Sequence, residues 1–225
     1  MLHSVGCPQP KASVFVKNWN SASYDRACVH GFIDANTGDI YQTLPWNHRG
    51  WHCGSGSKGS GNNTHIGVEM CEPATIKYTG WASFTCSDRA AALAAAERTY
   101  KAAVELFAHL CQQYGLDPLK DGVILSHREG HARGIASNHG DPEHLWKGLG
   151  MSYTMDTFRA AVKAQMGGTA PAPATPAPAP EKPATGVPYL VRVKITDLHI
   201  RSGPGTNYAR KGFIAPGAYP SVEES

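Results

Sequence analysis

The spacing of apolar residues predicts strands that alternate with helices over most of the chain. Residues 27–33 and 40–44 are rich in apolar residues, and the Asn-Thr-Gly-Asp turn between them predicts a β-hairpin. Two more apolar runs, 65–70 and 123–126, predict buried strands. Interleaved strands and helices are typical of an α/β domain, here with a central mixed sheet flanked by helices.

The longest helical pattern predicts a helix that Ser87 caps, that runs to about Tyr114 and that stops at Gly115. A shorter closing helix is predicted over 155–166. Helical spacing places these apolar residues on one buried face of the long helix: Leu93, Ala96, Tyr100, Ala103, Val104, Phe107, Leu110 and Tyr114.

A change in composition divides the chain. Residues 167–186 contain repeated Ala-Pro pairs, which predict a stiff extended linker between a domain at 1–166 and a module at 187–225. Two strands are predicted in that module, at 189–195 and 198–201, and its length indicates that it is cut short. The opening residues have no signal-peptide pattern, and His3 and Ser4 resemble the end of a strand, so we expect an incomplete N-terminus.

Composition and charge exclude some functions. The mean hydropathy is −0.33, and no apolar run approaches the roughly 18 residues that a membrane-spanning helix needs. The net charge of +3 suits contact with anionic cell-wall polymers but is too diffuse to indicate nucleic-acid binding. We expect a monomer. The six cysteines form no CxxC pair, and free thiols are favoured over disulfides in a core of this size.

The segment 127–144 concentrates histidines and carboxylates. A catalytic zinc site needs three protein ligands and an open fourth position. His127, at the end of a predicted strand, and Asp141 can supply two ligands, and His3 can supply the third. Two alternatives stay open, a solvated loop that merely contains histidines and an HExxH-like motif that would make His131 a ligand.

The HExxH alternative is weaker because Glu129 stands second after His127, and Gly130 and Gly134 argue against a helix there.

Glu69 is a carboxylate within an apolar strand, where burial is costly unless the group is paired or functional. The other interpretation is that Glu69 points to solvent. The glycine-rich stretch 54–61 lacks a phosphate-loop ending, so a flexible rim beside a cleft is favoured over nucleotide binding.

Five motifs occur in the order seen in the type 2 N-acetylmuramoyl-L-alanine amidases, which include phage endolysins and autolysins. They are residues 2–6, 29–34, 46–54 and 66–69 and the loop from Ser126-His127 to Asp141-Pro142. The match covers residues 1 to about 163. Residues 201–208 resemble the start of a bacterial SH3-type wall-binding domain.

The resemblance implies a zinc-bearing cleft in which His3, His127 and Asp141 bind Zn²⁺. Glu69 falls where relatives carry a catalytic glutamate, and His139 falls where many relatives have a lysine that stabilises the oxyanion. Val29 takes the place of a tyrosine found in some relatives. Trp46, Trp51 and His52 of the 46–54 motif are expected to bind substrate. For His52, and for His30 at another family-like position, packing or orientation inside the sheet is the favoured alternative.

The implied function is zinc-dependent cleavage of the amide bond between N-acetylmuramic acid and L-alanine in bacterial peptidoglycan. The enzyme would act on the cell wall after secretion or after phage-type release from the cytoplasm. Two alternatives are a recognition module that binds peptidoglycan without cutting it and a zinc peptidase that cuts the stem peptide.

Overall fold

The computed structural model describes residues 1–20, 23–167, 190–193, 198–201, 210–214 and 217–220. It divides the chain into two units, Met1–Ala170 and Pro171–Ser225. The boundaries predicted at 166 and 186 stay predictions, because residues 168–189 lie outside the described part of the chain. The functional residues predicted from the sequence all lie in the first unit.

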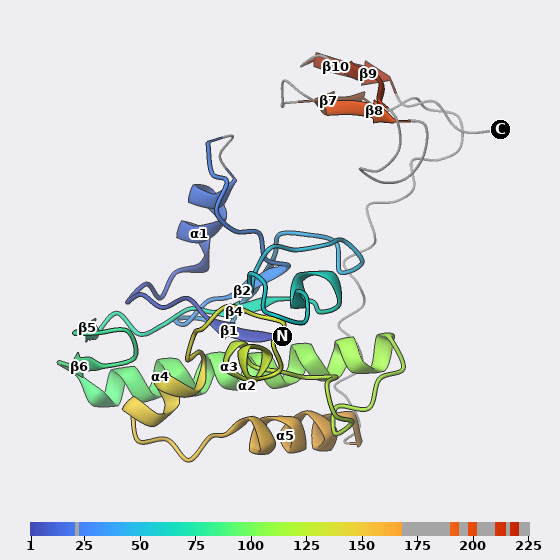
Figure 1. Ribbon diagram of the computed structural model, residues 1–225. Helices are drawn as coiled ribbons and strands as arrows, with labels where there is room; N and C mark the ends of the chain where they lie inside the picture. Colours follow the sequence, from blue (N-terminus) through green and yellow to red (C-terminus); the bar gives the residue numbers. More distant parts are fainter. Residues whose placement is uncertain (21–22, 168–189, 194–197, 202–209, 215–216, 221–225) are drawn as a thin grey trace. The chain divides into compact units, whose positions relative to one another are not determined.

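A four-stranded mixed sheet forms the centre of the first unit, in the order β1 (Leu2–Ser4), β4 (Val68–Met70), β2 (Gly31–Ile33) and β3 (Ile40–Gln42) (Figure 1). The first three strands are parallel, and β3 is antiparallel to β2. The α/β prediction is therefore confirmed. The three strands predicted at 27–33, 40–44 and 65–70 are present but shorter than predicted.

The two faces of the sheet are covered by different helices. Below it in Figure 1 lie α2 (Arg89–Gln113) and α5 (Met155–Gly167), and above it lies α1 (Ala12–Trp19). The main core includes Leu2, Ile33, Val68 and Met70 together with buried residues of α2 and α5. On the α1 side, Phe15 stacks on Phe32 with ring centroids 5.1 Å apart. Phe32 and Phe15 belong to a second, smaller core cluster on this side.

The long predicted helix is confirmed as α2, with two differences at its ends. Its N-cap is Asp88 rather than Ser87, because the Asp88 side chain accepts a hydrogen bond from the Ala91 amide at 3.0 Å. Ser87 instead donates to the carbonyl of Thr75. Tyr114 is the C-cap residue and is 42% exposed, so it does not belong to the buried face. The predicted closing helix corresponds to α5.

The strand predicted at 123–126 is reduced to one bridge between Leu2 and Ser126. The chain turns there into a short helix, α3 (His127–Ala132), so the expectation from Gly130 and Gly134 that no helix forms there is wrong. Ser126 and Glu129 form a capping box that stabilises its first turn. Gly134, with φ of +77°, lies beyond its end. His127 therefore begins a helix instead of ending a strand.

Smaller elements complete the first unit. They are the 3₁₀ helix η1 (Gly61–Asn63), the hairpin of β5 (Ile76–Tyr78) and β6 (Phe84–Cys86), and α4 (Glu143–Gly148). All six cysteines are free thiols, as expected. None of the helices in the described residues combines the length and the apolar character that crossing a membrane requires.

The second unit contains antiparallel strand pairs. β7 (Leu190–Val193) pairs with β10 (Gly217–Pro220), and β8 (Leu198–Arg201) pairs with β9 (Arg210–Ile214). Strands were predicted at 189–195 and 198–201, and β7 and β8 fall within these ranges. Most of the 201–208 motif lies outside the described residues, and the assignment to an SH3-type domain stays a prediction.

Candidate metal centre

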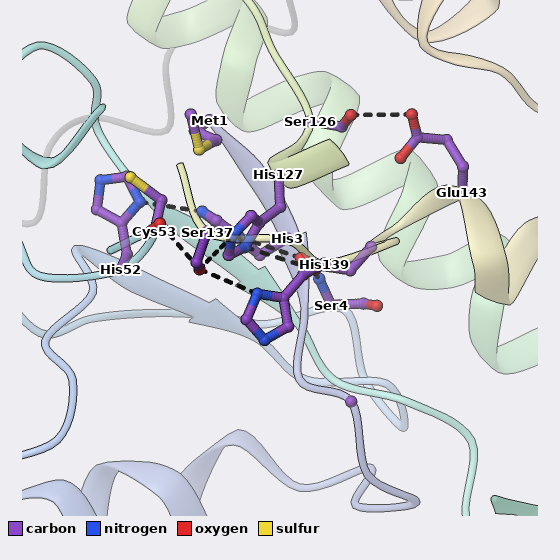
Figure 2. A network of polar contacts seen from close by, with 12 residues as sticks. Met1, His3, Ser4, His52, Cys53, Ser126, His127, Ser137, His139 and Glu143 are labelled. Carbon is purple, nitrogen blue, oxygen red and sulfur yellow. Dashed lines mark hydrogen bonds and ion pairs between the residues drawn. The ribbon is translucent and has the colours of Figure 1, made fainter. Parts of the chain in front are cut away.

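Three side chains from distant parts of the sequence meet at the edge of the sheet beside α3 (Figure 2). His3 comes from the middle of β1, His127 begins α3, and Asp141 lies in the loop before α4. The Nδ1 atom of His3 lies 3.1 Å from Nδ1 of His127 and 3.1 Å from Oδ2 of Asp141. Oδ1 of Asp141 lies 3.5 Å from Nδ1 of His127. The structure thus brings together the three residues predicted as metal ligands.

The spacing of these atoms fits a tetrahedral zinc site. Nitrogen and oxygen ligands bind zinc at about 2.0 to 2.2 Å, so two ligands of a tetrahedron are about 3.3 to 3.6 Å apart. The two imidazole nitrogens lie 3.1 Å apart, and His3 and His127 lie 3.1 and 3.5 Å from different oxygens of Asp141, so these separations are close to that range. Two imidazoles and one carboxylate also match the ligand types of catalytic zinc sites.

Burial keeps both imidazoles in the form that a metal binds. It lowers the pKa of His127 to about 4 and lowers that of His3 well below its ordinary value. Neutral histidine has a lone pair on one ring nitrogen, whereas the protonated ring has none. Both rings are therefore suited to coordinate a cation at neutral pH.

Hydrogen bonds hold His127 in place from two sides. Glu129, which completes the capping box of α3, forms two hydrogen bonds of 2.9 Å with the guanidinium of Arg159 on α5. On the other side of the ring, Nε2 of His127 lies 3.2 Å from Oγ of Ser137, and that hydroxyl donates to the carbonyl of Cys53. Since the hydroxyl proton goes to Cys53, Nε2 of His127 donates to Ser137 and Nδ1 keeps its lone pair.

His139 lies exposed beside this group. Its Nδ1 atom is 3.1 Å from Oγ of Ser137, and its ring centroid is 4.5 Å from that of His127. Figure 2 shows the His139 ring next to Ser137 and His127. The side chain can therefore reach a molecule that binds next to the three donors.

Glu69 lies on β4 in register with His3 on the neighbouring parallel strand. Paired residues of parallel strands share one face of the sheet, so both side chains lie on the α1 side. Glu69 is only 9% exposed, and its Oε2 atom has no hydrogen-bond partner among the described residues. Burial, with Asp141 and Glu72 nearby, raises the pKa of Glu69 well above its ordinary value. A buried carboxylate without a structural partner is typical of a functional site.

The three residues predicted to bind substrate lie in different surroundings. Trp51 is 49% exposed. Trp46 is half-buried, packs against the main core and stacks on His30. His52 is 8% exposed and contacts His3. His131, the alternative ligand, is exposed and lies 3.3 Å from the carbonyl of Ala136, so the structure does not bring it to the three donors.

The structure adds residues that sequence reasoning missed. Trp81, at the turn of the β5–β6 hairpin, is 89% exposed, and its ring centroid lies 6.0 Å from that of His139. The hairpin is tied to the centre by Tyr78, whose hydroxyl donates to Glu72 at 2.7 Å and lies 2.6 Å from Nε2 of His144. The one sequence signal for Trp81 was its position after Gly80 in a polar segment.

The first 144 residues match the sequence model of the N-acetylmuramoyl-L-alanine amidase family (Amidase_2). The chain belongs to this family. Among similar proteins of Bacillus subtilis (strain 168), the N-acetylmuramoyl-L-alanine amidase CwlH is 43% identical over 60 residues, which are 27% of this chain and 22% of CwlH. The N-acetylmuramoyl-L-alanine amidase XlyA is 58% identical over 36 residues, which are 16% of this chain and 12% of XlyA.

These matches span about a quarter of either curated amidase or less. Among solved structures, the chain is similar to the N-acetylmuramyl-L-alanine amidase AmiD from E. coli, in complex with the substrate anhydro-N-acetylmuramic acid-L-Ala-D-gamma-Glu-L-Lys. The identity is 16% and the TM-score is 0.42, over 68% of this chain and 56% of AmiD. Family membership therefore rests on the sequence match over residues 1–144.

Proposed function

We propose that this chain uses zinc to hydrolyse the amide bond between N-acetylmuramic acid and L-alanine in bacterial peptidoglycan. The observation that carries the proposal is the meeting of His3, His127 and Asp141 at zinc-like spacing beside the buried carboxylate of Glu69, in a member of an amidase family. A zinc ion held by the three residues would supply polarisation of the scissile carbonyl and a lowered pKa for the attacking water.

Glu69 is proposed as the general base, and the positive charge of a bound zinc ion would favour the ionised carboxylate that this role needs. It would take the proton from the attacking water and pass it to the departing nitrogen of L-alanine. Its position in register with His3 and its unpartnered oxygen support this role, because a carboxylate in a structural ion pair would not be free to exchange a proton.

His139 is proposed to stabilise the negative charge that develops on the carbonyl oxygen. Its Nδ1 atom donates to Oγ of Ser137, whose own proton goes to the carbonyl of Cys53, and this contact orients the ring. With both ring nitrogens protonated, Nε2 can donate a hydrogen bond to the oxyanion. His139 in this role must carry a proton on both nitrogens when the charge develops, because Nδ1 donates to Ser137.

The tryptophans are proposed to contact the substrate. Trp51 and Trp81 offer exposed rings, whereas the half-buried Trp46 would contribute mainly by supporting the wall of the cleft. Aromatic rings of this kind combine a large apolar face with a polar N–H group and suit sugar or peptide groups. His52 is buried against His3.

The decisive experiment is mass spectrometry of peptidoglycan sacculi after digestion with the purified chain. An amidase releases stem peptides whose L-alanine has a free amino group. A zinc peptidase would release fragments cut inside the stem, and a recognition module would release nothing. Removal of zinc with a chelator should stop release, and added Zn²⁺ should restore it. Release that persists without zinc would refute the metal-dependent part of the proposal.

Action on the cell wall, by secretion or by phage-type release, follows from this substrate and is part of the proposal. The SH3-type module proposed for 187–225 would add contact with the wall. A binding assay with sacculi tests that contribution by comparing the full chain with residues 1–167. The shorter chain should bind sacculi more weakly.

A further inference from the structure

We infer that His52 is a positioning residue that fixes which nitrogen of His3 carries the proton, so that His3 presents a lone pair to the metal. The inference rests on the zinc centre of the proposed function. It assigns His52 a positioning role next to His3, in place of the substrate contact expected from the sequence. The supporting observation is a chain of two hydrogen bonds that runs from the carbonyl oxygen of His65 through the ring of His52 to Nε2 of His3. Figure 2 shows the His52 and His3 side chains.

The direction of this chain follows from its end. Nε2 of His52 lies 3.0 Å from the carbonyl oxygen of His65, which can only accept a hydrogen bond, so Nε2 of His52 carries the proton. In a neutral ring, Nδ1 of His52 is then an acceptor. Nε2 of His3 lies 3.0 Å from it and must donate. The remaining nitrogen of His3, Nδ1, is left with a lone pair directed at His127 and Asp141.

Without His52 the opposite proton position would be favoured. The Oδ2 atom of Asp141 lies 3.1 Å from Nδ1 of His3 and is a strong acceptor that draws a proton to that nitrogen. A proton on Nδ1 would have to leave before a metal could bind. The acceptor nitrogen of His52 counteracts this by holding the proton on the far side of the His3 ring.

The surroundings of His52 hold it in this orientation. The backbone amide of His52 donates to Oδ1 of Asn62 at 2.7 Å. Gly67 and Gly50 press against the ring, and a Cβ atom on them would lie 2.3 Å from Cγ and 3.0 Å from Cδ2 of His52, respectively. At 8% exposure, with both ring nitrogens engaged, the side chain has no free polar atom to offer a substrate.

Three variants of the full chain test the inference. His52→Phe keeps the ring but removes the acceptor. His52→Asn keeps an acceptor oxygen near the position of Nδ1. His30→Asn is the matched control, because His30 is also buried and bonded through both nitrogens, to His48 O and Gly67 N, but touches no predicted ligand.

Two measurements are made on each variant. Competition with a chromophoric chelator gives the zinc affinity. Long-range ¹H–¹⁵N correlation spectra of the metal-free, histidine-labelled chain show which nitrogen of His3 is protonated. We expect the His3 proton on Nε2 in the unmodified chain, and a zinc affinity about 10- to 100-fold weaker in His52→Phe. His52→Asn should stay within about threefold of the unmodified chain, and His30→Asn should not change zinc affinity.

A His3 proton on Nδ1 in the unmodified chain would overturn the inference, and so would unchanged zinc affinity in a folded His52→Phe. An equal loss of affinity in His30→Asn would also overturn it, by showing that any buried histidine matters. If His52→Phe does not fold, the proton position in the unmodified chain and the affinity of His52→Asn decide. A chain that binds zinc as expected but releases no L-alanine peptides would refute the amidase proposal alone.

Discussion

Replacing Glu69 by glutamine tests the proposed chemistry most directly. Glutamine has nearly the same size, so the packing of β4 against β1 should persist, but its amide cannot accept the proton of the attacking water. General acid–base catalysis contributes about 10²- to 10⁴-fold to rate, so kcat should fall by that factor, which is about 3 to 5 kcal/mol in activation free energy. KM and zinc content should change little, because Glu69 is not among the three grouped donors.

The assay is the initial rate of stem-peptide release over a range of sacculus concentrations, with zinc content measured on the same samples. Glu72→Gln is the matched control, since Glu72 lies three residues further along and is fully buried, with one oxygen bonded to Tyr78 and the other to the Gly6 amide. The Glu72→Gln substitution should leave kcat within about tenfold of that of the unmodified chain, well short of the loss expected for a general base. A Glu69→Gln variant whose kcat stays within that range at full zinc content would refute the role of Glu69.

Three further predictions concern stability and substrate binding. Burial raises the pKa of Glu72 from 4.5 to about 7, so its protonated form stabilises the fold below pH 4.5 and this contribution is lost as the pH rises through 7. In urea titrations, the unfolding free energy of Glu72→Gln should therefore rise relative to that of the unmodified chain between these pH values. A difference that stays constant with pH would contradict this. Trp81→Ala should raise KM about 2- to 10-fold without changing kcat or the melting temperature, because the ring is exposed, and steady-state kinetics with thermal melts check both. Glu129→Ala removes the capping box of α3 and the pairing with Arg159, and should cost about 1 to 3 kcal/mol by urea denaturation; a loss below about 0.5 kcal/mol would show that neither contact matters.

The parts of the fold that the sequence predicted are those with long or strongly apolar patterns. The helix α2 repeats its apolar residues over seven turns, and β4 lies in the predicted strand 65–70, where Ile66, Val68 and Met70 recur at every second position. The three donors were predictable because their residue types and order follow a known family pattern, although residue spacing alone left His131 as an alternative ligand.

The missed elements are short and depend on contacts from elsewhere in the chain. Helix α1 has eight residues and no side-chain cap, and it is held by the contact of Phe15 with Phe32. Gly130 and Gly134 argued against helix α3, but Gly134 lies beyond its end, and the capping box and the bonds to Arg159 outweigh the low helix propensity of Gly130. The position of Trp81 beside His139 depends on a hairpin whose anchor, Tyr78, contacts residues that are distant in sequence.

The donor atoms come from opposite ends of the first unit: His3 is separated by 124 positions from His127 and by 138 positions from Asp141. An ion bound by all three would act as a cross-link that closes nearly the whole of this unit into a loop. During synthesis, a nascent chain could bind the ion through all three residues only after residue 141 had left the ribosome and the sheet had formed. Zinc-loaded protein should consequently resist proteases that nick the metal-free form.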